Sequence, residues 1–178
     1  MQHILASLDD KGCAGVVLDT GACYRTEPLY KKERDIRKWF IENDLIEGVI
    51  YLPANIFYNT TTHGVIIFLN KNKEKNKKDK LLLINASVNF KKGDPKNFLS
   101  EKDIKLISDT YINWKEVQNF SVIINNEVIA TRDYNISPNR YITSLTTNQY
   151  ESISDLTKTI KELKKQEKNI LKKLKDII

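Results

Sequence analysis

The 178-residue sequence has few of the residues that build metal sites, disulfide frameworks or glycine-rich phosphate loops. It contains two cysteines and two histidines, which show no metal-ligand spacing. The six glycines show no GxG spacing, and none of the four prolines is adjacent to another. No apolar run approaches the roughly 20 residues of a membrane span, and the amino terminus does not resemble a secretion signal. We therefore expect a cytoplasmic protein with reduced thiols and no membrane partner.

The composition is that of a globular chain with an excess of basic residues. Hydrophobic residues make up 40% of the sequence and can supply a core for one domain of ordinary size. The formal charge is +6 and the isoelectric point is near 9.1. This charge permits a polyanionic partner such as nucleic acid but does not identify one.

The first 70 residues alternate strand and helix patterns. The predicted elements are a helix from Gln2 to Leu8, a strand from Cys13 to Leu18, a helix from Glu33 to Asn43, and strands from Gly48 to Leu52 and from Val65 to Leu69. Gly12 suits the left-handed position after the first helix, and the uncharged run that follows is typical of a strand buried on both faces. The link from Leu52 to Val65 is too short for a crossover helix, so we expect the last of these strands to return antiparallel.

The second half begins with the run Lys71 to Lys80, which contains almost only Lys, Asn, Glu and Asp and predicts a solvated excursion. Ser100 and Asp103 form a capping box at the start of a predicted helix. The other predicted elements are a strand from Leu81 to Ala86, the continuation of that helix to Trp114, a hairpin of Phe120 to Ile124 and Glu127 to Thr131 that turns at Asn125-Asn126, and irregular chain from Asp133 to Tyr141.

The segment from Leu52 to Thr60 places the adjacent aromatics Phe57 and Tyr58 beside amide and hydroxyl side chains. Aromatic rings stack on nucleobases, and amides can hydrogen-bond to a base edge. The segment therefore has the chemistry of a nucleobase pocket. The alternative is that both aromatics pack beneath the strand connection and that Asn55 and Asn59 satisfy their own loop backbone.

The loop from Asp19 to Arg25 follows the carboxyl end of a predicted parallel strand. Ligands of open α/β sheets bind at such ends, so this loop can line the cleft of the active site. A solvated loop explains Arg25 equally well.

The last 30 residues, from about Gln149, contain no Gly or Pro and predict a long helix. Its apolar residues recur in steps of three and four, interrupted by Glu167, as in a coiled-coil seam. These residues are Ile153, Leu156, Ile160, Leu163, Ile170, Leu174 and Ile177. The stripe either packs back on its own domain or binds another helix, and its narrow width over this length favours a partner.

Several of these segments occur in the same order in one enzyme family. Leu52 to Thr60 resembles the LPxNxFYNT stretch of the adenine-specific DNA methyltransferase (modification) subunit of type I restriction-modification systems. The resemblance covers nearly the whole chain. The other matching stretches are Gln2 to Leu8, Gly12 to Leu18, Ile36 to Asp44, Leu83 to Ser87, Phe98 to Ile104 and Asp133 to Tyr141.

This resemblance implies an α/β fold, namely the C-terminal portion of a Rossmann-like S-adenosylmethionine-dependent methyltransferase sheet with an antiparallel last strand, plus a C-terminal coiled-coil-like helix. The implied parts are catalytic sheet at 1–70, a solvated Lys-rich loop at 71–80, a family-specific α/β extension at 81–147 and an assembly helix at 148–178. Complete enzymes also carry a glycine-rich loop for S-adenosylmethionine and an Asn-Pro-Pro-Tyr/Phe tetrad, and neither occurs in this sequence. We therefore expect a C-terminal part, either an expressed fragment or a truncated gene product, that binds no cofactor by itself.

The resemblance also implies roles for residues and partners. Phe57 best matches the aromatic that stacks on the flipped adenine, with Tyr58 second, and Asn55 and Asn59 are expected to contact substrate. No residue is expected to be catalytic, to bind cofactor or to ligate metal. The implied partners are DNA, the restriction subunit and the specificity subunit, which the C-terminal stripe is expected to bind unless it self-associates. The alternative function is a non-catalytic assembly or DNA-binding module that uses the same helix.

Overall fold

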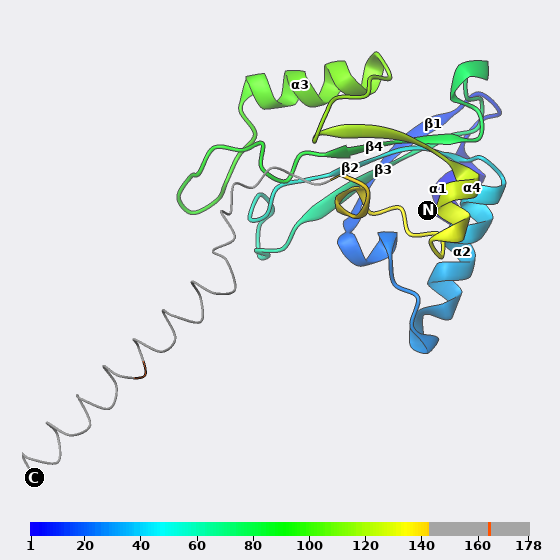
Figure 1. Ribbon diagram of the computed structural model, residues 1–178, viewed down its shortest axis with the longest axis horizontal. Helices are drawn as coiled ribbons and strands as arrows, with labels where there is room; N and C mark the ends of the chain where they lie inside the picture. The colour runs from blue at the N-terminus through cyan, green and yellow to red at the C-terminus, as the bar shows by residue number, and fades with distance from the viewer. Residues whose placement is uncertain (143–163, 165–178) are drawn as a thin grey trace, which may run out of the picture. The chain divides into compact units, whose positions relative to one another are not determined.

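The computed structural model describes residues 1–142 and Lys164, which is helical and exposed. The chain divides into two units, residues 1–144 and 145–178, and only the first is described in detail. Its five strands form one sheet in the order β1-β3-β2-β4-β5 (Figure 1). The strands are β1 (Cys13–Asp19), β2 (Ile46–Tyr51), β3 (Gly64–Asn70), β4 (Lys80–Asn85) and β5 (Ser121–Asn125). The helices are α1 (Gln2–Ser7), α2 (Lys31–Glu42), α3 (Glu101–Ile112) and α4 (Asn126–Thr131), with 3-10 turns η1 (Thr20–Cys23), η2 (Pro28–Tyr30), η3 (Lys75–Lys77) and η4 (Pro138–Arg140).

Strand directions place the ends of three strands at one edge of the sheet. β3 lies between β1 and β2 and is antiparallel to both, which confirms the predicted antiparallel return. β4 is parallel to β2, and β5 is antiparallel to β4. The strands β1, β2 and β4 therefore run in the same direction, and their carboxyl ends meet at a common edge.

The two faces of the sheet carry separate hydrophobic clusters. On one face Phe40 and Ile41 of α2 pack with Ile67 of β3 and with Ile129 of α4, and all four side chains are nearly inaccessible to solvent. On the other face α3 contributes Ile107 to a second cluster with residues of β2 and β4. The predicted capping box of α3 is confirmed, because the Asp103 amide donates to Ser100 Oγ and the Ser100 amide donates to the Asp103 carboxylate.

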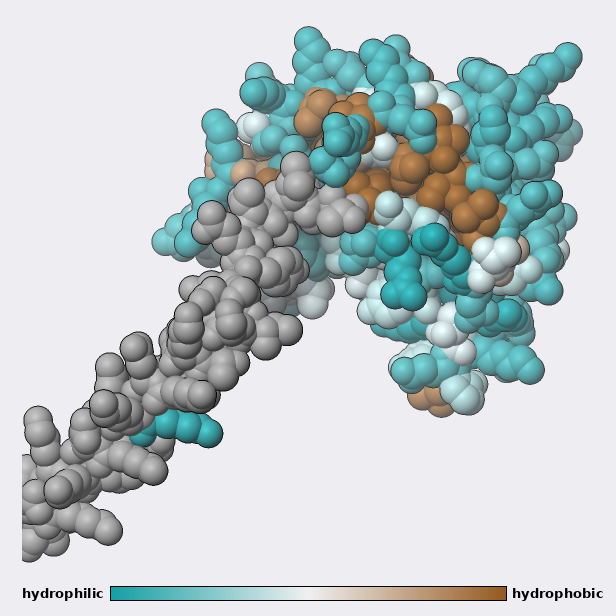
Figure 2. Space-filling view, in the orientation of Figure 1, coloured by the Kyte–Doolittle hydropathy of each residue, from teal (hydrophilic) through white to brown (hydrophobic). Residues whose placement is uncertain are grey.

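The prediction that the first strand is buried on both faces is wrong. Cys13, Gly15 and Val17 are exposed, and Val17 retains 55% of its accessible surface. β1 lies at the edge of the sheet, and α3 covers the neighbouring part of this face, where Tyr111 stacks on Phe68 of β3. Figure 2 shows apolar side chains gathered on the surface beside α3. An uncharged strand sequence indicates an apolar environment but not how many of its faces are covered.

The prediction that the run Lys71 to Lys80 is solvated is only partly correct, because two of its lysine side chains are largely buried. The side chain of Lys73 is only 2% exposed, and its Nζ lies 2.5 Å from Asp44 Oδ1 and 2.9 Å from the Lys80 carbonyl oxygen. Lys77 Nζ lies 3.0 Å from Glu47 Oε1 at the start of β2. Buried lysines are tolerated here because each ammonium has a carboxylate partner.

Three smaller predictions also differ from the structure. Asn125-Asn126 is not a hairpin turn, because α4 begins at Asn126, whose side-chain amide donates to the Ile41 carbonyl and to Asp44 Oδ1. The helix buries Ile129 in the first cluster, which a second hairpin strand at this edge would not do. Gly12 does not adopt a positive φ; it lies against Asp9, where a Cβ would approach the Asp9 carbonyl oxygen to 2.9 Å. α3 ends at Ile112 rather than at Trp114.

Candidate functional site

The candidate site is the β2–β3 loop, residues 52–63, at the edge where the parallel strands end. Asn55 and Asn59 adopt left-handed backbone conformations, with φ of 58° and 61°. Asparagine tolerates this region better than most residues do. The two predicted substrate-binding amides therefore also determine the turns of the loop.

The two adjacent aromatics of the loop have different environments. The Phe57 ring is half-buried and packs with the second hydrophobic cluster. It lies so close to Gly64 that a Cβ at that position would fall 2.6 Å from Phe57 Cε2. Tyr58, in contrast, is 85% exposed. The structure thus holds one ring in a fixed place at the base of the loop and projects the other into solvent.

The loop is held from outside by the segment that connects β4 to α3, residues 86–100. Lys96 Nζ donates to Asn55 Oδ1 at 2.9 Å and to the Thr60 carbonyl at 3.1 Å. The Asn97 side chain donates to the Ala54 carbonyl at 2.9 Å, and its backbone amide donates to the Asn55 carbonyl at 2.9 Å. Sequence reasoning missed both residues, because a single Lys-Asn pair 40 residues from the loop carries no pattern that links it to the site.

The remaining polar residues of the loop bond locally. Thr60 Oγ1 and Thr62 Oγ1 lie 2.8 Å apart, and the Thr62 amide donates to Thr60 Oγ1. His63 Nδ1 lies 2.8 Å from the Leu52 carbonyl oxygen, and the His63 ring packs on Tyr51 with centroids 4.9 Å apart. Within the described part of the chain no group of three or more His, Cys, Asp and Glu side chains could hold a metal ion. The contacts of His63 with Leu52 and Tyr51 join the two ends of the loop.

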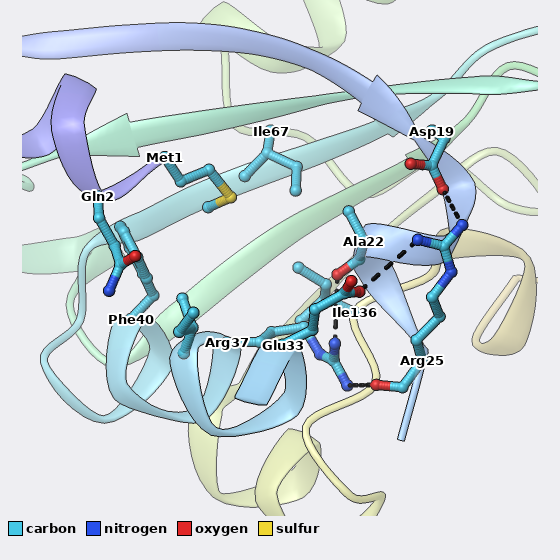
Figure 3. A pocket seen from close by; sticks show the side chains of 11 residues that line it. Met1, Gln2, Asp19, Ala22, Arg25, Glu33, Arg37, Phe40, Ile67 and Ile136 are labelled. Carbon is cyan, nitrogen blue, oxygen red and sulfur yellow. Dashed lines mark hydrogen bonds and ion pairs between the residues drawn. The ribbon is translucent and has the colours of Figure 1, made fainter. Parts of the chain in front are cut away.

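The loop that follows β1 borders a cavity of about 250 Å³ whose arginine side chains already have ion-pair or hydrogen-bond partners (Figure 3). Arg25 forms ion pairs with Asp19 at 2.9 Å and with Glu33 at 3.7 Å. The buried Arg37 donates to the carbonyls of Ala22, Arg25 and Tyr134. Burial lowers the pKa of Arg37 below its ordinary value, and burial raises the pKa of the neighbouring Cys23 thiol to about 12. The thiol is therefore protonated and unreactive at neutral pH.

The predicted partner-binding residues Ile153, Leu156, Ile160, Leu163, Ile170, Leu174 and Ile177 lie outside the described residues. No helix among the residues that the structure describes is both long and apolar enough to cross a membrane.

Comparison with known proteins supports the predicted resemblance. The profile of the N-6 DNA Methylase family matches residues 1–150. The methylase subunit of the type I restriction enzyme MjaVII of Methanocaldococcus jannaschii is 39% identical over 88% of this chain and 27% of its own length. The MpnII methylase subunit of Mycoplasma pneumoniae is 32% identical over 99% of this chain and 31% of its own length.

A crystal structure shows the same relationship. The type I restriction-modification methyltransferase subunit from Streptococcus thermophilus superposes with a TM-score of 0.68 at 32% identity, over 75% of this chain and 27% of that one. The chain thus spans less than a third of the length of these relatives. Its five-stranded mixed sheet resembles part of a type I methyltransferase subunit, and the resemblance stated from the sequence is confirmed. The chain belongs to the N-6 DNA Methylase family.

Proposed function

We propose that this chain is the target-base and subunit-assembly portion of a type I N6-adenine DNA methyltransferase subunit. The complete subunit would transfer a methyl group from S-adenosylmethionine to the exocyclic amine of adenine, and this portion would hold the extruded base. The observation that supports the proposal is the position of Phe57, a half-buried ring anchored at the carboxyl edge of the sheet beside a loop of amides and hydroxyls.

Base extrusion explains why an anchored ring is useful. Flipping a base out of a duplex costs a few kcal/mol in lost stacking and pairing. Stacking on an aromatic platform returns about 1–3 kcal/mol per base. A ring that is already held in place by Gly64 and the second cluster loses little conformational entropy when it stacks, so Phe57 suits this role better than the exposed Tyr58.

The test uses a full-length type I methylase subunit that carries this chain as its C-terminal portion. We expect Phe57→Ala to reduce methyl transfer to DNA by about 5- to 150-fold, which corresponds to the loss of about 1–3 kcal/mol of stacking. Tyr58→Phe keeps its ring and should retain near-parent activity. The measurement is transfer of a tritiated methyl group to duplex DNA under single-turnover conditions.

The control is Trp39→Ala, which removes a half-exposed aromatic ring from α2, outside both the β2–β3 loop and the segment 86–100, and it should methylate DNA as the parent does. If Phe57→Ala methylates DNA as fast as the parent subunit does, Phe57 is not the stacking platform. If Tyr58→Ala alone abolishes methylation, the two aromatics have the opposite roles.

We also propose that the C-terminal stripe mediates assembly with a specificity subunit. The support comes from the sequence, in which seven Ile and Leu residues recur with coiled-coil spacing on an otherwise Lys-rich segment. An assembly module without a catalytic role is the competing function. If Phe57→Ala loses methylation but still assembles, the target-base function is favoured over an assembly module without a catalytic role.

A further inference from the structure

A polar cleft of about 390 Å³ lies at the carboxyl ends of β1 and β2, on the sheet edge that also carries the β2–β3 loop. Thr20 follows β1 directly, and Tyr51 is the last residue of β2. The ring of Tyr51 packs on His63, the last residue of the loop. The cleft is lined by Thr20, Tyr24, Tyr51, Asn135, Ser137, Asn139 and Arg140. A volume of this order is within the range that holds small ligands.

Every side chain that lines this cleft carries a group that can donate a hydrogen bond, and none is acidic. Arg140 is exposed and forms no ion pair within residues 1–142. Asp19, next to Thr20 in sequence, is already paired with Arg25. The Tyr51 hydroxyl is protonated at neutral pH and can donate, as an ordinary tyrosine does, and burial, with a smaller contribution from Tyr24, raises its pKa further. The cleft therefore differs from the cavity of Figure 3, where carboxylates neutralise the exposed cation.

The segment that supplies Asn139 and Arg140 is held rigidly. The Ile136 amide donates to the Cys23 carbonyl, and the Ile136 side chain is fully buried. The Ser137 amide donates to Asn135 Oδ1, and Ser137, itself only 4% exposed, donates through Oγ to Asn139 Oδ1. The last bond uses the acceptor of the Asn139 amide, so its NH₂ group stays available as a donor.

We propose that this cleft binds a phosphate group of the target DNA strand, with Arg140 as the cation and Asn139, Thr20 and Tyr24 as neutral donors. Arg, Asn, Thr and Tyr side chains are the groups that proteins use to bind phosphate oxygens. The exposed ring of Tyr24 and the nearby β2–β3 loop favour a nucleotide over an isolated anion. The inference rests on the proposed function, because it assigns a backbone contact to the strand whose base that loop would hold.

The test uses the 178-residue chain and follows the backbone amide resonances of Thr20, Tyr24 and Asn139 by nuclear magnetic resonance. The probes are deoxyadenosine 5′-monophosphate, deoxyadenosine, inorganic phosphate and a short single-stranded oligodeoxynucleotide. We expect the monophosphate and the oligonucleotide to shift these resonances, and deoxyadenosine to leave them unchanged. Inorganic phosphate should act only at concentrations at least tenfold higher. Binding should weaken as salt is raised, since it neutralises a phosphate.

Arg140→Gln should weaken binding of the monophosphate at least tenfold. Lys105→Gln removes the same charge from the exposed face of α3 and should bind as the parent does. Equal affinity of Arg140→Gln and the parent, or equal shifts with deoxyadenosine and its monophosphate, would overturn the proposal. Inorganic phosphate that binds as tightly as the oligonucleotide would also overturn it, since the cleft would then be a site for a free anion.

Failure of this inference is distinguishable from failure of the proposed function. Phosphate binding to the chain requires no base stacking, whereas the methylation assay on Phe57→Ala does. If the cleft does not bind phosphate but methylation depends on Phe57, only the phosphate-binding inference is wrong. If the cleft binds nucleotide but Phe57→Ala does not change methylation, only the assignment of Phe57 as the stacking platform is wrong.

Discussion

Glu47 is a buried acid at the start of β2 that is compensated on several sides. It is 6% exposed and accepts hydrogen bonds from Asn70 at 2.8 Å, from Lys77 at 3.0 Å and from the Tyr111 hydroxyl at 3.3 Å. Burial alone would raise the pKa of this carboxyl, but the bonds from Asn70 and Lys77 hold it below its ordinary value. The ionised form is therefore the one that the fold stabilises.

The bonds to Glu47 lead to a prediction about the stability of the fold at low pH. Because the folded pKa of Glu47 is lowered, its contribution to stability is complete above the unfolded pKa of about 4.3 and is lost as the pH falls through the folded value. We expect Glu47→Gln to reduce the free energy of unfolding by about 1–3 kcal/mol at pH 7 and by clearly less at pH 3. Urea unfolding followed by circular dichroism at the two pH values measures the difference.

The control for this prediction is Glu27→Gln, because Glu27 is exposed and its side chain forms no bond within residues 1–142. It should have a small effect at both pH values. A deficit of Glu47→Gln that stays constant from pH 7 to pH 3 would show that the carboxylate charge contributes nothing.

At the scale of elements, local patterns predict those parts of the fold that are determined locally. The capping box of Ser100 and Asp103 and the antiparallel return through the β2–β3 connection each depend on residues that are close in sequence, and the structure confirms both. The predicted hairpin at Asn125-Asn126 is wrong, because the Asn126 side chain bonds to α2 and to Asp44 and a helix begins there instead. The burial of Lys73 depends on Asp44, 29 residues away, which no local pattern of charges reveals.

The candidate site also has one part that the sequence reveals and another that only the fold brings together. The β2–β3 loop is visible in the sequence because its aromatics, amides and hydroxyls are contiguous. Lys96 and Asn97, which both lie in the connection between β4 and α3, reach this loop only after the chain has folded. Arg140, from the segment after α4, reaches the neighbouring cleft in the same way. The stretch from Asp133 to Tyr141 matches the family, but the sequence alone assigns no role to it.

The segment at 86–100 gives a prediction about the stiffness of the β2–β3 loop. Lys96→Met removes an ammonium that bonds to Asn55 and to Thr60, and each lost charge-assisted bond weakens local stability by about 1–3 kcal/mol. We expect the amides of Thr62 and Asn97 to exchange with solvent at least fivefold faster, as measured by hydrogen–deuterium exchange. Lys92→Met, at an exposed position on the same segment, should leave the exchange rates unchanged. Unchanged rates in Lys96→Met would mean that the loop holds its own shape.

At the scale of the whole molecule, the chain combines a structured α/β unit with a C-terminal stripe. The chain covers less than a third of its relatives' length, and the activity and the assembly that we propose are those of a complete type I methylase subunit. The stripe contains seven Ile and Leu side chains at coiled-coil spacing. Burying apolar surface is favourable by roughly 25 cal/mol per Å², and a helix cannot bury its own stripe. Association with another helix would supply that burial.

The stripe therefore predicts the effect of two central substitutions. Ile160→Asp combined with Leu163→Asp should abolish binding to a specificity subunit, or self-association of the isolated chain, because two carboxylates would be desolvated in the seam. Sedimentation velocity measures the assembly, and circular dichroism checks that the strand-rich unit stays folded. Ser154→Asp combined with Asn169→Asp introduces two carboxylates, with the same change of net charge, at positions of the repeat that lie away from the stripe, so this control should still assemble. If the Ile160 and Leu163 variant assembles as the parent does, the stripe packs within its own chain and another surface mediates assembly.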